Sequence, residues 1–314
     1  MSPNRIMCML QAAIVADAFG VPYEFKQRGT YAVAPEMVGG GFWEQAPGTW
    51  SDDTALTLAL LDHLTHADSY TKLMDRLTAY METGAYTPTG QLFDIGNACA
   101  KAIRTYVIEQ AEPTMCGDPS EFANGNGALM RLAPLAVVLY AEPRFVTRAK
   151  SYRAYTQMTH RHPRAVLGSI IYLETLWQLL HGKSLTQALM TVNFSLAALP
   201  GDEQAELPTF KRLFAADFMA LPQSAIKSSG YVVDSLEAAF WVAGNATDLK
   251  QGVMTAASLG EDTDTVATIA ASLLAASGKD VIPEVWWHAI VNRELAESYM
   301  RPFAQKFAET NESN

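Results

Sequence analysis

The stretch SDDTALTLALLDHL, residues 51–64, indicates the fold class. Leu56, Leu60 and Leu64 recur every four residues, which is the spacing of one face of an α-helix. Apolar residues also recur three or four positions apart in three later segments, 166–180, 236–242 and 266–274. We find no convincing series of alternating strands. The sequence therefore predicts an all-α protein with roughly ten or more helices joined by short connections.

Composition and length point to one compact domain. The chain has 314 residues, of which 49% are hydrophobic and 18% charged, so wholesale disorder and fibrous repeats are excluded. No flexible linker and no repeat with a solenoid period is visible. We expect a single multi-helix domain over residues 1–309 and a disordered tail over residues 310–314.

The charge balance limits the partners. Lys and Arg number 23 and Asp and Glu 33, which gives a net charge of −10. Because no run of basic residues exists, the sequence argues against non-specific binding to nucleic acid. Hard cations suit an acidic protein, although a mild acidic excess is usually only a soluble surface.

The N-terminus and the cysteines bear on location. The apolar run 6–16 follows Arg5 and resembles a signal peptide, but Asp17 interrupts it, so we expect a buried first helix. No other apolar run is long enough to span a bilayer. The three cysteines, Cys8, Cys99 and Cys116, have no zinc or disulfide spacing, which is typical of a reduced, cytoplasmic protein. No unexplained apolar stripe is visible, so we expect a monomer.

Two acidic clusters stand directly before apolar helices. The first is SDDT at residues 51–54 and the second GEDTDT at residues 260–265. Helix capping is one explanation, because Ser, Asp and Thr satisfy the free N–H groups of a helix start. Two caps need only two side chains, however, and adjacent carboxylates repel one another unless a cation lies between them. All-oxygen ligands suit Mg²⁺, Mn²⁺ or Ca²⁺ rather than zinc. If the two helix starts converge, they could hold two metal ions between Ser51, Asp52, Asp53, Asp262, Asp264 and Thr265.

Two other segments carry acidic residues for which both a functional and a structural role are possible. Asp94 lies between Gly90 and Gly96, and Glu24 lies among apolar residues, so a buried Glu24 would need a partner. The alternative for Glu24 is a surface glutamate at a helix end.

A glycine-rich turn and a histidine complete the candidates. Gly125, Asn126 and Gly127 could let backbone N–H groups approach phosphate oxygens, or form only a turn with an N-cap. His160 could donate a hydrogen bond to a phosphate or ribose, or have only a structural role.

Taken in order, these segments resemble the ADP-ribosylglycohydrolase family, which includes dinitrogenase-reductase-activating glycohydrolases and ADP-ribosyl-acceptor hydrolases. The resemblance covers residues 17 to about 275, nearly the whole chain. The matching motifs are Asp17-Ala-x-Gly-x-Pro-x-Glu-Phe25, Ser51-Asp-Asp-Thr54, Thr89-Gly…Asp94-Ile-Gly-Asn97, Gly125-Asn-Gly-Ala-x-Met-Arg131, Thr159-His160, the segment 230–239 and Gly260-Glu-Asp-Thr-Asp-Thr265.

The resemblance implies a compact all-α domain whose central cleft holds two Mg²⁺ or Mn²⁺ ions. The ligands by position would be the six residues reached from the acidic clusters. The family more often has Thr at the first of these positions, where this chain has Ser51; both residues offer oxygen ligands.

The resemblance also implies roles for the other segments. Asp94 would be an acid near the scissile ribose, and Glu24 would be a glutamate that contacts the metal region and can move on substrate binding. Both are the candidate catalytic carboxylates. The substrate-binding residues would be Gly90, Gly96, Gly125, Asn126, Gly127, His160 and Tyr231. Tyr231 would stack on adenine, with a core tyrosine as the alternative, and Asp234 would be structural.

The implied reaction is hydrolysis of the glycosidic bond at ribose C1″ of an ADP-ribosylated protein or small molecule. The acidic surface favours a cationic acceptor such as arginine. Serine-linked, nucleic-acid-linked or other small-molecule adducts remain alternatives. So do a non-catalytic ADP-ribose-binding relative and a different metal-dependent hydrolase on the same scaffold.

Overall fold

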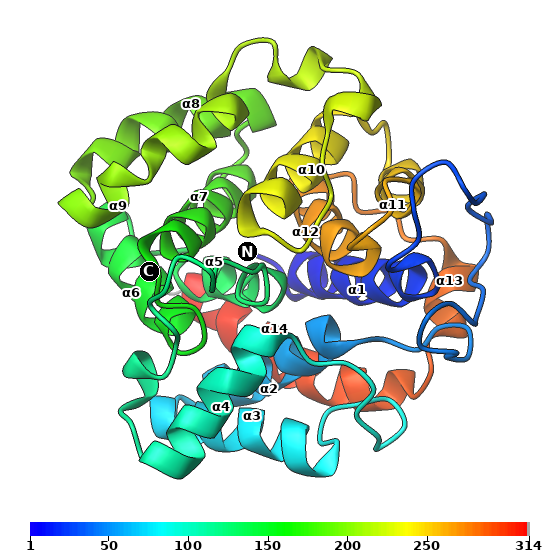
Figure 1. Ribbon diagram of the computed structural model, residues 1–314, viewed down its shortest axis with the longest axis horizontal. Helices are drawn as coiled ribbons and strands as arrows, with labels where there is room; N and C mark the ends of the chain where they lie inside the picture. The colour runs from blue at the N-terminus through cyan, green and yellow to red at the C-terminus, as the bar shows by residue number, and fades with distance from the viewer. Residues whose placement is uncertain (313–314) are drawn as a thin grey trace.

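The computed structural model describes residues 1–312 and is helical throughout, as predicted (Figure 1). Only isolated β-bridges pair extended segments within residues 1–312. The helices are α1 (Pro3–Gly20), α2 (Asp52–His66), α3 (Tyr70–Thr83), α4 (Asn97–Glu109), α5 (Pro134–Val138), α6 (Phe145–Gln157), α7 (Pro163–Leu180), α8 (Leu185–Ser195), α9 (Gly201–Ala205), α10 (Val232–Asn245), α11 (Leu249–Ser258), α12 (Thr263–Ala276), α13 (Glu284–Ala289) and α14 (Arg293–Glu312).

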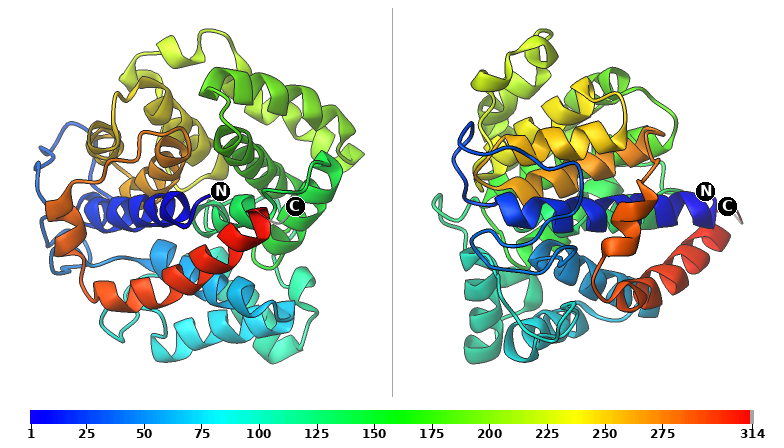
Figure 2. Two further views of the ribbon diagram at one scale, coloured as in Figure 1. Left: turned by 180° about the vertical axis from the view of Figure 1, so that it is seen from behind. Right: turned by 90° about the vertical axis from the view of Figure 1, so that its right-hand side faces the viewer.

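Helices α1 and α12 form the centre of the molecule. Every residue of α12 is buried, and α1 packs along it, while α10, α11 and α7 also contact α12. Helices α2 and α14 contact α1 from its other side. Figures 1 and 2 show this arrangement, with the first helix crossing the middle of the molecule. A helix that is apolar on all faces belongs in such a central position.

One glycine sets the distance between the two central helices at the site end. A Cβ on Gly20 would lie 2.3 Å from the Cα of Asp264, so no other residue fits there without a shift. The hydroxyl of Thr263 donates to the carbonyl oxygen of Gly20 over 2.8 Å. The end of α1 is therefore fixed directly against the start of α12.

Helix α1 also explains the signal-like N-terminus. The helical segment Pro3–Tyr23 is long and apolar enough to cross a membrane, but 78% of its apolar window is buried inside the fold. The predicted buried first helix is confirmed.

The C-terminus forms the long helix α14. It continues to Glu312, so the tail predicted over residues 310–314 lies partly within this helix and, at 313–314, outside the described residues.

Candidate functional site

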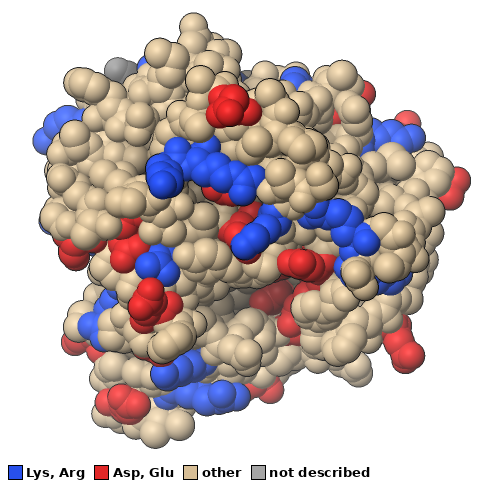
Figure 3. Space-filling view, turned by 45° about the horizontal axis from the view of Figure 1, so that its top comes forward, with Lys and Arg blue, Asp and Glu red and all other residues tan. Residues whose placement is uncertain are grey.

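A cavity of about 520 Å³ opens where α1 ends and where α2 and α12 begin. A hollow with acidic side chains in its depth is visible on the face drawn in Figure 3. The cavity collects most of the predicted site residues from distant parts of the chain. Those that line it are Glu24, Asp52, Asp94, Gly96, Gly125, Asn126, Gly127, His160, Asp262, Asp264 and Thr265.

Two contacts hold the helix starts together. The buried Asp17 of α1 accepts hydrogen bonds from the backbone N–H groups of Ser51 and Thr54 at 3.1 and 3.0 Å. The hydroxyl of Thr265, in the first turn of α12, donates to Asp53 Oδ2 of α2 over 3.1 Å. The convergence considered from the sequence is therefore present.

Capping explains only part of the acidic clusters. Ser51 Oγ accepts from the N–H of Asp53 at 3.2 Å and caps α2. Asp262 occupies the N-cap position of α12, but its side chain accepts no capping bond. Asp53 Oδ1 and Asp262 Oδ1 are buried and have no hydrogen-bond partner within the described chain. Since an unpaired buried carboxylate oxygen is costly, these atoms point to a ligand rather than to a cap.

The donor set fits a hard cation. Glu24, Asp94 and Asp264 present carboxylate oxygens that all lie within 4.8 Å of one another. Oxygen ligands in such a cluster are typical of Mg²⁺, Mn²⁺ and Ca²⁺. The family resemblance implies that Glu24 and Asp94 are candidate catalytic carboxylates, with Glu24 in contact with the metal region, and the cluster brings both of them to the candidate metal ligand Asp264.

The electrostatics of the cavity also favour a cation. Burial, followed by repulsion between neighbouring carboxylates, raises the pKa of Asp94 to about 8 and that of Glu24 to about 9. Burial likewise raises the pKa of Asp52 to about 7 and the pKa values of Asp53 and Asp264 well above the usual range. None of these carboxylates forms an ion pair with Lys or Arg in the described part of the chain. Protons or metal ions must balance their charge.

The glycine-rich turn borders the carboxylates. Asn126 Nδ2 donates to Asp262 Oδ2 and to Ser235 Oγ, each over 2.8 Å. The Asn126 N–H donates to the carbonyl oxygen of Gly230 at 3.0 Å, while Gly125 forms an isolated bridge with Tyr231. The turn is thus tied to the start of α10 and directly to a candidate metal ligand.

His160 faces the glycine-rich turn 125–127, and its imidazole is neutral. Arg131 is buried and donates to Thr159 Oγ1 at 2.8 Å and to the carbonyl oxygen of Gly127. Thr159 Oγ1 lies 2.9 Å from His160 Nδ1. Because Arg131 can only donate, the Thr159 hydroxyl is free to donate its own proton to Nδ1, which leaves the proton of the imidazole on Nε2. Burial and the charge of Arg131 lower the pKa of His160 to about 3, so the ring offers a neutral N–H to the cavity.

Comparison with known proteins identifies the family. The family model for ADP-ribosylglycohydrolase matches residues 2–313. This chain belongs to the ADP-ribosylglycohydrolase family. The predicted family, all-α fold and hydrolase class are therefore confirmed.

Similar proteins support the same assignment. The chain is 30% identical to the ADP-ribosylarginine hydrolase Tri1 of Serratia proteamaculans, over 92% of this chain and 77% of that protein. It is 27% identical to the ADP-ribosyl-[dinitrogen reductase] glycohydrolase of Rhodospirillum rubrum, over 93% of each. A solved chain described as an ADP-ribosylglycohydrolase-related protein complex has a TM-score of 0.78 and 28% identity, covering 96% of this chain and 98% of that one.

Four predicted residues do not line the cavity of this glycohydrolase. Ser51 and Asp53 are buried on either side of the lining residue Asp52, and they join α2 to Asp17 and Thr265. Gly90 lies against Gly84, whose added Cβ would meet the Gly90 carbonyl oxygen at 2.5 Å. Tyr231 is the N-cap residue of α10 and is half-buried, and this burial raises the pKa of its hydroxyl.

Three groups at the site were not predicted as site residues. Asp17 organises the start of α2, and Arg131 organises Thr159 and the glycine-rich turn. Both stand in the motifs that carry the family resemblance, which was the available signal. The third group consists of aromatic side chains at the cavity mouth: Phe25, Phe42, Trp43 and Phe122.

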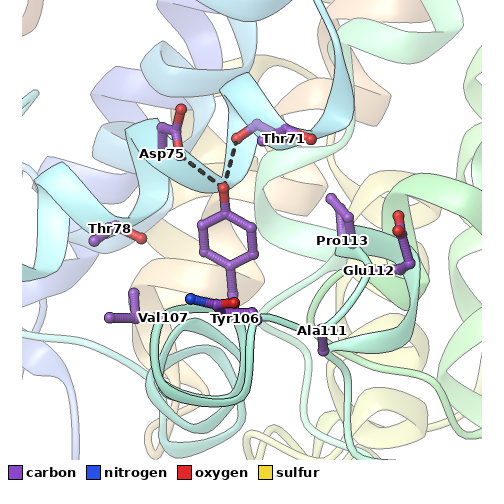
Figure 4. Close-up of a pocket in the computed structure, with 9 residues that line it drawn as sticks. Thr71, Asp75, Thr78, Tyr106, Val107, Ala111, Glu112 and Pro113 are labelled. Carbon is purple, nitrogen blue, oxygen red and sulfur yellow. Dashed lines mark hydrogen bonds between the residues drawn. The ribbon is translucent and has the colours of Figure 1, made fainter.

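A second hollow of about 500 Å³ lies between α3 and α4 (Figure 4). The Tyr106 hydroxyl donates to Asp75 Oδ1 at 2.7 Å and lies 3.5 Å from the carbonyl oxygen of Thr71. Asp75 also pairs with Lys72 at 3.3 Å. None of the residues that line this hollow has a buried side-chain oxygen or nitrogen without a hydrogen-bond partner in the described chain, so the hollow lacks the unpaired buried carboxylates of the first cavity.

Proposed function

We propose that the protein is a metal-dependent hydrolase that releases ADP-ribose from an arginine-type acceptor by cleaving the glycosidic bond at ribose C1″. The observation that carries the proposal is the group of buried carboxylates without ion-pair partners at two converged helix starts. The names of the relatives from Serratia proteamaculans and Rhodospirillum rubrum support the acceptor and the reaction.

The proposed cofactor is a pair of Mg²⁺ or Mn²⁺ ions. Their ligands would be Ser51, Asp52, Asp53, Asp262, Asp264 and Thr265, and Glu24 and Asp94 lie close enough to Asp264 to contribute oxygens. When bound, such ions orient the ribose hydroxyls and activate a water molecule.

The remaining chemistry falls to side chains of the cavity. Glycosidic cleavage builds positive charge on the ribose, which the neighbouring carboxylates stabilise. Glu24 and Asp94 line the cavity beside the candidate metal site, so either carboxyl group is placed to give a proton to the leaving nitrogen of the acceptor. The Nε2–H of His160 and the turn 125–127 are placed to donate hydrogen bonds to the diphosphate or ribose.

The decisive experiment measures ADP-ribose released from ADP-ribosyl-arginine by the purified protein with Mg²⁺, with Mn²⁺ and with EDTA. We expect release that depends on metal. Calorimetry with free ADP-ribose separates two failures. Metal-dependent binding without turnover would redirect the proposal to serine-linked or other adducts, and no binding at all would overturn the assigned pocket.

We further propose a monomer in the cytoplasm. Size-exclusion chromatography with light scattering tests the first of these, and a mass twice that of the chain would overturn it.

A further inference from the structure

Three aromatic side chains of the cavity lining, together with Phe93 packed against one of them, form a continuous row of rings. We call Phe25, Phe42, Trp43 and Phe93 the aromatic rim. Phe42 packs edge-on against Phe25 and Trp43, with ring centroids 5.0 and 4.8 Å apart. Trp43 continues the contact to Phe93 at 5.7 Å. Three segments far apart in sequence thus meet in one aromatic surface.

Two of the four rings are exposed, whereas Trp43 and Phe93 are partly buried. The side chain of Phe25 is 57% exposed and that of Phe42 66% exposed. Phe25 also has a φ of +61°, a left-handed conformation that bulky residues rarely adopt. Its N–H donates to the carbonyl oxygen of Glu261 over 2.6 Å, and Glu261 donates back to Lys26 over 3.0 Å. The fold therefore holds a strained residue in place to present an apolar ring to solvent, which is typical of a ligand site.

The rim lies at the carboxylate end of the cavity. Phe25 follows Glu24 in the chain, and Phe93 precedes Asp94. Trp43 Nε1 donates to Glu24 Oε2 at 2.5 Å. Phe122, another exposed aromatic residue of the cavity, instead precedes the turn 125–127. The scissile bond belongs with the carboxylates, so the group beyond that bond would leave past the aromatic rim.

We propose that the aromatic rim is the acceptor subsite and that it binds the guanidinium group of arginine by stacking. This inference rests on the proposed function. A guanidinium is planar, permanently charged and weakly hydrated, so it stacks well on aromatic faces. A serine acceptor has neither the charge nor the plane that this surface recognises.

The first test measures binding of the free acceptor. Arginine and citrulline have nearly the same shape, but the urea of citrulline is neutral. We expect calorimetry with the Mg²⁺-loaded protein to give tighter binding of arginine than of citrulline, and Phe42→Leu to abolish the difference. Equal affinities of the wild type for the two compounds would overturn the aromatic rim as a guanidinium site.

The second test uses turnover of ADP-ribosyl-arginine. Phe42→Leu keeps an apolar side chain but removes the ring face, and should raise KM about three- to thirtyfold while the affinity for free ADP-ribose stays unchanged. Phe194→Leu, which alters an exposed phenylalanine on α8, is the matched control and should change neither. An unchanged KM in Phe42→Leu, or an equal loss of ADP-ribose affinity, would overturn the proposal.

The two tests keep the two proposals apart. A protein that binds arginine through the aromatic rim but hydrolyses no adduct would uphold the rim and contradict the proposed function. A protein that hydrolyses ADP-ribosyl-arginine equally well with and without the Phe42 ring would uphold the proposed function and contradict the aromatic rim as the acceptor subsite.

Discussion

The aspartates at the two ends of α2 lie in opposite electrostatic environments, and their pKa values shift in opposite directions. At the start of the helix, Asp52 and Asp53 are buried among other carboxylates, and both have raised pKa values. At the far end, Asp62 accepts from Arg76 Nε and from the Tyr86 hydroxyl, each at 2.7 Å. These hydrogen bonds lower the pKa of Asp62 despite its partial burial.

At one end of α2 the carboxylates form ion pairs with an arginine, and at the other end they have no ion-pair partner in the described chain. Arg76 also pairs with Asp68 at 2.9 Å, so one guanidinium serves two carboxylates at that end. Nothing equivalent reaches the carboxylates of the cavity in the described chain, although the buried Arg131 lies nearby without touching them. Because an uncompensated buried charge is costly, the carboxylates without ion-pair partners at the start of α2 could bind a cation.

The largest expected effect comes from removing one of the cavity carboxylates. Asp264→Asn keeps the shape beside Gly20 but removes a negative charge from the candidate metal site. We expect metal-dependent release of ADP-ribose to fall about 100-fold or more, because even residues that only support metal ligands contribute about 10- to 100-fold. The metal-free variant should unfold at a higher temperature than the wild type, because one source of repulsion is gone.

Asp234→Asn is the control, since Asp234 accepts from Ser229 at 2.7 Å at the start of α10, outside the cavity lining. Release by Asp264→Asn at the wild-type rate would contradict the metal mechanism. An unchanged helical circular dichroism spectrum shows that both variants fold.

The second prediction concerns pH. Carboxylates with raised pKa values bind more protons in the folded than in the unfolded protein, so their contribution to stability is lost as pH rises through the folded pKa values. Between pH 5 and pH 8 we expect the metal-free protein to lose about 5 °C or more in Tm. Saturating Mn²⁺ should restore this loss, so that the stabilisation by metal grows with pH.

Scanning fluorimetry with EDTA and with Mn²⁺ at each pH measures both curves. A Tm of the metal-free protein that rises between pH 5 and pH 8 would mean that the cavity carboxylates are balanced within the fold, and the comparison between the ends of α2 would fail.

Local signals were enough to predict the helices and the acidic helix starts. The spacing of Leu56, Leu60 and Leu64 and the excess of carboxylates over caps are both visible within a few residues. The meeting of Asp53 with Thr265 depends on the packing of α1 on α12, which local spacing does not determine.

Roles that depend on distant partners were harder to predict. In the sequence, Asp17 only interrupts an apolar segment. In the structure it accepts hydrogen bonds from the backbone at the start of α2. The family resemblance implies a substrate role for Gly90, whereas the structure places Gly90 against Gly84 and outside the cavity lining. The exposure of Phe25 and Phe42 is a property of the folded surface and has no signal in the sequence.

The third prediction addresses the ion-paired end of α2. Arg76→Gln leaves Asp62 and Asp68 without their shared cation, which should cost about 1–2 kcal/mol at pH 7 because part of the interaction is screened by solvent. Both carboxylates have lowered pKa values, so this stabilisation is present above the unfolded pKa and is lost as pH falls. The wild type and the variant should therefore converge in stability near pH 3, while activity at 25 °C stays unchanged.

Urea unfolding at pH 7 and pH 3 measures that difference. Lys72→Gln is the matched control, because its pair with Asp75 spans 3.3 Å between two exposed side chains. A larger effect of Arg76→Gln on turnover than on stability would contradict the separation of the two ends.

The smallest expected effect isolates the neutral donor at the same carboxylate. Tyr86→Phe removes the hydroxyl that donates to Asp62 at 2.7 Å but leaves Arg76 in place. We expect a loss of about 0.5–1.5 kcal/mol, less than in Arg76→Gln, since Asp62 keeps its charged partner. The pKa of Asp62 should move up only part of the way towards its ordinary value, which nuclear magnetic resonance titration of the carboxyl can measure. If the shift instead matched that in Arg76→Gln, hydrogen bonding rather than pairing with a cation would distinguish the two ends of α2. The comparison between the two ends would then no longer support a metal ion at the start of the helix.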